Sequence, residues 1–266
     1  MLRRLIRISP VLVTCVLALG IGRGTPQAGE VQIAQAPAGA PAAALVAKGR
    51  DLFNDTKLSA DGKWSCATCH PEGGHTDNKT YVGLNVVKDG DPTGRSTPTM
   101  WGVGKRQTFS WAGTAPSLRA NIRGIIVNRM KGPEPSAETL DALIAYVTSL
   151  DYPANPNLKP DGTPSDAAPA AAKRGYELFV SKAGCKACHL PPNYDKQGVE
   201  DIDSGGNFKI PSLRVVSRTA PYFHDGRYAT LEQAVRGMWE YMKKAGTTEK
   251  LTDADLNDLV EFMKIL

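Results

Sequence analysis

Two short motifs of cysteine and histidine have residue types and a spacing that can do metal or porphyrin chemistry. Residues 66–70 read Cys-Ala-Thr-Cys-His, and residues 185–189 read Cys-Lys-Ala-Cys-His. Two thiols three residues apart on a helical turn can reach both vinyl groups of one haem, and the next residue, histidine, is then placed below the iron as its proximal ligand. The pattern predicts two covalently bound haem c groups, attached through Cys66, Cys69 and His70 and through Cys185, Cys188 and His189.

Zinc binding and disulfide bonding are the alternatives for the two cysteine pairs. Pairs with this spacing occur in zinc sites, and in an exported protein two structural disulfides would be the simplest use of four cysteines. Neither alternative explains why a histidine directly follows each pair. A thioredoxin-like redox pair would need a βαβ context, which the sequence lacks.

The elements that must position the two motifs form an internal repeat. Segments 47–53 and 172–179 each predict a short helix that runs into a cysteine pair, with apolar residues at helical spacing. Segments 136–150 and 252–266 align at a constant offset of 116 residues and begin with the N-cap residues Ser136 and Thr252. Because strand-like alternation is almost absent, we expect an all-α fold with two cytochrome c-like haem domains in tandem.

The N-terminus is typical of an export signal. Arg3, Arg4 and Arg7 precede an apolar stretch over 8–22, which is shorter than the roughly 20 residues that a transmembrane helix needs. We therefore predict a signal peptide over 1–30 and a periplasmic location. The alternatives are a retained membrane anchor and lipidation at Cys15, where the preceding residues loosely resemble a lipoprotein cleavage box.

The remaining chain divides at a segment rich in Pro, Ala, Asn and Asp. We predict an N-terminal haem domain over 31–152, a linker over 153–171 and a C-terminal haem domain over 172–266. Segments 80–104 and 190–211 are expected to be loops packed around the cofactors. Hydrophobic residues make up 41% of the chain, enough for a packed core.

The charge of the chain argues against nucleic-acid binding. The formal net charge is +5, but residues 1–28 hold four arginines and no acid, so the rest has 28 basic and 27 acidic residues and a net charge of +1. Long-range steering of a partner should be weak. Membrane contact is expected only if the leader is retained.

Each iron needs a sixth ligand or an open coordination site. A methionine ligand raises the reduction potential and suits electron transfer, whereas an open site suits the binding of peroxide or another small ligand. His75 follows His70 by only five residues and is expected in a loop or beside the porphyrin rather than as a ligand. Met238 and Met242 lie one helical turn apart in the second unit, and position alone does not separate them. The other candidates are His224, Met100, Met130 and Met263.

Residues 211–238, with the sequence PSLRVVSRTAPYFHDGRYATLEQAVRGM, closely resemble the C-terminal segment of the bacterial dihaem cytochrome c peroxidases and their MauG-type relatives. In the first unit, segments 58–70, 97–99 and 109–113 resemble the same family. The resemblance implies reduction of peroxide or a similar small oxidant at the N-terminal haem, with electrons relayed through the C-terminal haem. It also implies a small periplasmic electron donor, either a cytochrome c or a copper protein, and a homodimer.

The resemblance further implies roles for individual residues. Met238 matches the sixth ligand of the second haem, where MauG-type members carry Tyr. Trp111 matches a tryptophan between the two haems, although plain core packing is its alternative, and Asn121 stands where peroxidatic members place Gln. Thr219 and Pro221 match two ligand positions of an interdomain calcium ion.

The sequence departs from the peroxidase pattern at three places. Segment 91–96 contains no His to cap the first haem, so its iron is either open or capped by Met100 or Met130. The Asn of the calcium site is replaced by Gly102. Segment 125–131 contains no Glu to handle peroxide protons, and Glu134 is displaced from the expected place. A dihaem electron carrier without catalysis is therefore the alternative function. A MauG-like modification of a partner protein ranks third because the Tyr ligand is absent.

Overall fold

The structure is a computed structural model that describes residues 40–202 and 204–266. The predicted signal peptide and Cys15 lie outside the described residues. Among the residues described, no helix combines the length and the apolar character needed to cross a membrane.

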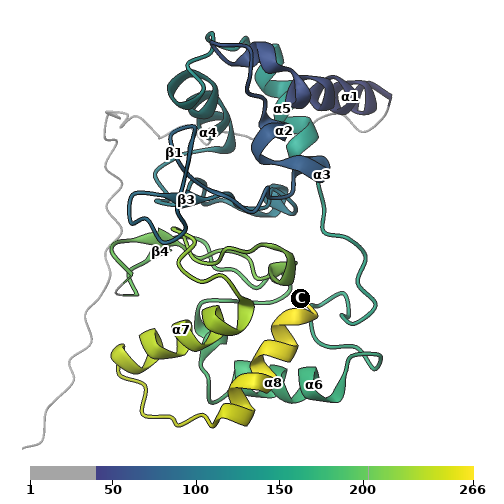
Figure 1. Ribbon diagram of the computed structural model, residues 1–266. Helices are drawn as coiled ribbons and strands as arrows, with labels where there is room; N and C mark the ends of the chain where they lie inside the picture. The colour runs from purple at the N-terminus through teal and green to yellow at the C-terminus, as the bar shows by residue number, and fades with distance from the viewer. Residues whose placement is uncertain (1–39, 203) are drawn as a thin grey trace, which may run out of the picture. The chain divides into compact units, whose positions relative to one another are not determined.

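The first half is built from a long opening helix and a long closing helix that pack against each other (Figure 1). Shorter helices between them carry the first cysteine pair and the middle of the domain. The elements are α1 (Ala40–Asn54), α2 (Cys66–Cys69), α3 (Pro71–Gly74), α4 (Leu118–Gly124) and α5 (Ala137–Ser149), with the one-turn helices η1 (Thr56–Leu58) and η2 (Val103–Lys105) and the π-helical turn η3 (Ile125–Arg129).

The second half has the same plan and a longer middle helix (Figure 1). Its opening and closing helices again pack against each other. The elements are α6 (Ala170–Val180), α7 (Leu231–Lys244) and α8 (Asp253–Lys264), with the one-turn helices η4 (Cys185–Ala187) and η5 (Val216–Arg218). The prediction of two tandem cytochrome c-type domains in a mainly helical fold is confirmed.

Glycines in the two opening helices show the repeat at the level of contacts. A methyl group on Gly49 would overlap the carbonyl oxygen of Ala142, and one on Gly175 would overlap that of Asp258. The two carbonyls are related by the same 116-residue offset as the closing helices. In each half, the absence of a side chain lets the opening helix lie directly on the backbone of the closing helix.

Aromatic side chains one turn beyond each glycine repeat the same packing. Phe53 meets Tyr146 edge-on with ring centroids 5.1 Å apart, and Phe179 meets Phe262 edge-on at 5.3 Å. The predicted N-caps are also present, because the Ser136 side chain accepts from the backbone N–H of Thr139 and the Thr252 side chain accepts from that of Asp255.

Five strands of two or three residues lie in the segments predicted as loops. Strands β1 (Thr80–Val82), β2 (Asn85–Val87) and β3 (Arg95–Ser96) form an antiparallel sheet in the order β2-β1-β3. Strands β4 (Val199–Glu200) and β5 (Phe208–Lys209) pair with Val199 opposite Lys209. Strands this short leave no readable alternation in the sequence, which explains why they were not predicted.

The segment predicted as an extended linker packs against the second half. Asn155 donates its side-chain amide to the carbonyl of Ile265 at 2.7 Å, and the carbonyl of Gly162 accepts from the Tyr194 hydroxyl at 2.6 Å. Ala168 is buried in the core of that half, and α6 begins at Ala170, within the predicted linker. Contacts that are remote in sequence therefore order this segment.

Candidate haem sites

The second cysteine pair lies on a tight turn that holds a histidine against the domain core. Cys185 begins η4, Cys188 directly follows it, and His189 comes next with 9% of its surface exposed. The Nδ1 atom of His189 lies 3.0 Å from the carbonyl oxygen of Tyr194, which is itself fully buried. A histidine that ligates a metal is commonly held in this way through one ring nitrogen, so that the other nitrogen binds the metal.

The first cysteine pair has the same geometry. Cys66 and Cys69 begin and end α2, and the Nδ1 atom of the adjacent His70 lies 3.1 Å from the carbonyl oxygen of His75. His75 and Tyr194 each stand five residues after their histidine, at the same 119-residue offset that relates the cysteine pairs. These two carbonyl partners were not predicted from the sequence, although the internal repeat relates them.

Burial controls the protonation of both motifs. It lowers the pKa of His70 to about 4 and also lowers that of His189, while nearby carbonyl groups act in the opposite direction. It raises the pKa of the Cys66 and Cys185 thiols to about 12. The imidazoles are therefore neutral near pH 7, which is the form that binds a metal.

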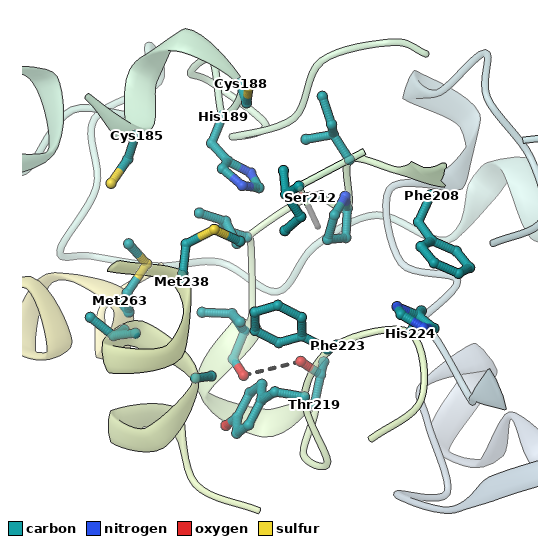
Figure 2. Close-up of a pocket in the computed structure, with 18 of the residues that line it drawn as sticks. Cys185, Cys188, His189, Phe208, Ser212, Thr219, Phe223, His224, Met238 and Met263 are labelled. Carbon is teal, nitrogen blue, oxygen red and sulfur yellow. Dashed lines mark hydrogen bonds between the residues drawn. The ribbon is translucent and has the colours of Figure 1, made fainter. Parts of the chain in front are cut away.

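A cavity of about 270 Å³ lies beside the second motif. Figure 2 shows the side chains of His189, Cys185, Met238 and Met263 directed into it. The wall beyond these residues is mostly apolar and includes Phe179, Leu213, Val216, Leu231, Val235 and Leu259.

The donor set and the shape of this site fit haem c. Two unbridged thiols, a neutral imidazole held by its Nδ1 atom and a thioether meet in one apolar cavity. A zinc ion would need further ligands, and residues 40–202 and 204–266 contain no cluster of three or more His, Cys, Asp or Glu side chains. In the first half, Cys66, Cys69 and His70 match this arrangement, which fits a second haem c.

The surroundings of Met238 and Met242 differ. Met238 lies on α7 and points toward the side of the cavity where His189 lies (Figure 2). The terminal methyl of Met242 lies 3.6 Å from the point that a Cβ on Gly184 would occupy, beside the cysteine turn. Met242 also lines the cavity. Ligation by Met238 stays a prediction that rests on the family resemblance.

The structure gives Met238 a counterpart in the first half. Helices α4 and α7 both begin after a capping side chain, Ser117 or Thr230, and both continue with Leu. Aligned from these caps at an offset of 113 residues, Arg-Gly-Ile at 123–125 matches Arg-Gly-Met at 236–238. The position of Met238 is therefore taken by Ile125, which is half-buried against the first core and carries no ligand atom.

The two other candidate ligands of the first iron have contacts of their own. Met130 is 5% exposed and belongs to the first core. The backbone N–H of Met100 donates to the carbonyl of Gly74 at 2.8 Å, and its side chain packs against that core. The ring of His75 is bonded to the hydroxyl of Thr99 at 3.0 Å and to the carbonyl of Arg218 at 3.2 Å. These contacts account for His75 without a bond to iron.

Trp111 lies where the two halves meet. It lines the second cavity, and its indole N–H donates to the carbonyl of Ser96 in the first half at 2.7 Å. Its own carbonyl accepts from the backbone N–H of Lys209 in the second half at 2.8 Å. Asn121 lies on α4, half-buried, and is not part of this cavity wall, so the structure does not bring it together with Trp111 there.

The residues predicted to bind calcium also line this cavity. The hydroxyl of Thr219 donates to the carbonyl of Val216 at 3.1 Å, and the carbonyl of Pro221 accepts from the hydroxyl of Ser96 at 3.3 Å. The calcium ion and its ligands stay a prediction.

Comparison with known proteins matches both halves. Residues 43–155 match the family model described as di-haem cytochrome c peroxidase, and residues 172–266 match the model described as cytochrome c. The chain is 30% identical to the methylamine utilization protein MauG of Methylorubrum extorquens, over 83% of this chain and 77% of that protein. It is 28% identical to the cytochrome c551 peroxidase of Nitrosomonas europaea, over 82% of this chain and 78% of that protein.

A solved structure shares the fold. A MauG-like protein associated with microbial copper homeostasis superposes with a TM-score of 0.66 and 24% identity, covering 84% of this chain and 88% of that one. The two cytochrome c domains imply two covalently bound haem c groups. The chain belongs to the di-haem cytochrome c peroxidase and MauG family.

Proposed function

We propose that this protein is a periplasmic dihaem peroxidase that reduces peroxide or a similar small oxidant at the first haem. Electrons would enter at the second haem, whose iron His189 and Met238 would hold. When bound, haem supplies one-electron redox chemistry and an iron that accepts a small ligand if its sixth position is free. The observation that carries the proposal is a difference between the two halves. The first half has Ile125 at the position where the second half has Met238.

This exchange gives the two haems different tasks. A thioether on α7 favours the reduced iron and suits electron transfer. An isoleucine at the matching position of the first half cannot bind iron, which supports an open face for a small oxidant. Trp111 supports the relay, since it is bonded to Ser96 on one side and lines the cavity of His189 on the other.

The carboxylate and the arginines considered for proton transfer also set a limit on the reaction. The carboxylate of Glu134 accepts two bonds of 2.6 Å from the guanidinium of Arg123, and both side chains are about half exposed. Arg129 donates to the carbonyl of Gly83 at 2.7 Å. A positioned proton-transfer group typically accelerates a reaction by about 10²–10⁴. We therefore expect slower turnover than in relatives that have a catalytic Glu.

Stopped-flow mixing of the reduced protein with hydrogen peroxide tests the proposal. We expect reoxidation of both haems within seconds, and a high-spin ferric signal from the first haem in the resting protein. Ile125→Met should convert this signal to low spin and slow the reaction with peroxide. Val127→Met is the control, because it adds the same side chain two residues further along. Reduced wild-type protein that stays reduced in peroxide would overturn the proposal.

A dihaem electron carrier without catalysis is the second candidate. The pairing of Glu134 with Arg123 favours it, since this carboxylate is already engaged at the surface. A low-spin first haem in the resting protein, with no change on addition of cyanide, would decide for the carrier.

The donor, the assembly and the metal content belong to the same proposal. We propose a small periplasmic cytochrome c or copper protein as donor, a homodimer, and a calcium ion near Thr219 and Pro221. The net charge of +1 over residues 29–266 supports a local docking patch rather than long-range steering. Steady-state assays with purified donors at two salt concentrations, sedimentation, and metal analysis of the purified protein test these three points.

A further inference from the structure

A half-buried arginine from the first half lines the second cavity and has one buried donor without a partner in the described part of the chain. Arg106 follows η2, and one terminal nitrogen, Nη2, donates to the carbonyl of Trp101 at 2.9 Å and to the hydroxyl of Tyr152 at 3.3 Å. Its Nε atom is buried and has no hydrogen-bond partner among the described residues. Buried donors without a partner are rare, because each loses its bonds to water.

A lysine from the second half lies in the same wall. Lys209 is 9% exposed, and its ammonium lies 5.3 Å from the centre of the Trp111 indole ring. Burial, together with the neighbouring Arg106, lowers its pKa to about 7, while Asp195 acts in the opposite direction.

Asp195 is one buried carboxylate near two cations. Burial raises the pKa of its carboxyl group, and Arg106 and Lys209 act in the opposite direction. Glu200 also lines the cavity but is paired with Lys196. One carboxylate beside two cations leaves an excess of positive charge, and a buried charge without a partner is costly, so this wall is suited to bind an anion.

The chemistry of the cavity identifies the anion. Its cysteines, histidine and methionine hold a haem, and haem c carries two propionate carboxylates as its only anionic groups. Arginine and lysine donors form strong, charge-assisted bonds with carboxylates. Arg106 and Lys209 both line the cavity that contains His189 and Met238.

We infer that Arg106 and Lys209 bind a propionate of the second haem. Because Arg106 belongs to the first half, the haem site of the second half is complete only when both halves are present. A nearby cation favours the less positive, reduced iron, so this pair also raises the reduction potential of the second haem. The inference rests on haem binding alone and does not depend on peroxidase activity.

The test is the midpoint potential of the methionine-ligated haem, measured by spectroelectrochemistry on protein that contains two haems per chain. Lys209→Met and Arg106→Met should each lower the reduction equilibrium constant by about tenfold, equal to about 59 mV for a one-electron couple. Lys209→Arg should keep the potential close to that of the wild type. Lys264→Met removes an exposed lysine paired with Glu261, neither of which lines the cavity, and should leave the potential unchanged.

If the methionine variants do not fold, resonance Raman spectra of charge-conserving variants test the same inference. Lys209→Arg and Arg106→Lys keep the charge but change the donor geometry, so the propionate bending bands of the second haem should shift. Unchanged potentials in both methionine variants, or unchanged propionate bands in both conservative variants, would overturn the inference. An equal loss of potential in Lys209→Met and Lys209→Arg would also contradict it.

Discussion

The two haem domains share their opening and closing helices and differ in what lies between them. In the first half, Cys69 has polar and charged neighbours, the hydroxyl of Tyr81 and the guanidinium of Arg129, and Ile125 stands at the position that matches Met238. In the second half, the motif faces an apolar cavity that contains Met238. The same helical frame thus supports two iron sites, and the middle segments decide the chemistry of each.

The difference also extends to the junction of the halves. Arg218 pairs with Glu72, its carbonyl accepts from His75, and its guanidinium lies over the ring of Trp101. Arg106 in turn reaches the second cavity. Residues of each half therefore contribute to the surroundings of the other site, which explains how two similar domains acquire distinct properties.

Removal of one haem at a time should change the haem content and the absorption spectrum more than any other substitution. Cys66→Ser with Cys69→Ser, or Cys185→Ser with Cys188→Ser, should reduce the haem content from about two per chain to about one, because each pair attaches one porphyrin. A pyridine haemochrome assay measures the content. Only the first double variant should keep the spectrum of a methionine-ligated haem, and the same residual spectrum from both variants would contradict the difference between the halves.

An added methyl group at the crossing of the opening and closing helices should destabilise both halves equally. Gly49→Ala and Gly175→Ala each place a methyl group on a backbone carbonyl of the facing helix, and overpacking of this kind should cost about 3 kcal/mol. Thermal unfolding followed in the haem absorption measures the loss. In the control Gly124→Ala, the nearest atom is 3.8 Å away, so removal of a helical glycine should stabilise by up to about 1 kcal/mol.

Replacement of each methionine of α7 by leucine should show which of the two is the iron ligand. Met238→Leu should lower the reduction equilibrium constant of the second haem by about 100-fold, equal to about 120 mV, since a thioether ligand favours the reduced iron. Met242→Leu removes a thioether that packs on Gly184 and should change the potential little. A redox titration with an optical readout measures both, and a larger shift in Met242→Leu would reverse the assignment.

Substitutions of the two residues whose backbone carbonyls hold the proximal histidines should have the smallest effects on stability. Phenylalanine at either position keeps the backbone carbonyl that accepts from His70 or His189. His75→Phe loses two side-chain bonds and should cost about 2 kcal/mol, whereas Tyr194→Phe loses only its bond to Gly162 and should cost about 1 kcal/mol. Chemical denaturation measures both values. A loss of either haem in these variants would show that the side chains, and not the carbonyls, hold the imidazoles.

Local patterns in the sequence predicted much of the frame. The C-x-x-C-H motifs depend on spacing within one turn. The apolar residues of α5 and α8 recur at the spacing that every α-helix imposes. Both features could therefore be predicted from the sequence. The N-caps at Ser136 and Thr252 were predicted for the same reason. The short strands and the packed linker were not, because each depends on hydrogen bonds to residues that are remote in sequence.

The sequence by itself determined the two haem attachments, the tandem repeat and the opening and closing helices, since all of these depend on neighbours within a few residues. Only the tertiary structure decided which side chains surround each haem. It placed both Met238 and Met242 along the cavity, brought Trp111 to the junction of the halves, and set Arg106 and the buried Lys209 in the wall of one cavity. These roles depend on burial and on contacts between residues about a hundred positions apart in the sequence. The charge and the ligand properties of a side chain depend on its neighbours in space.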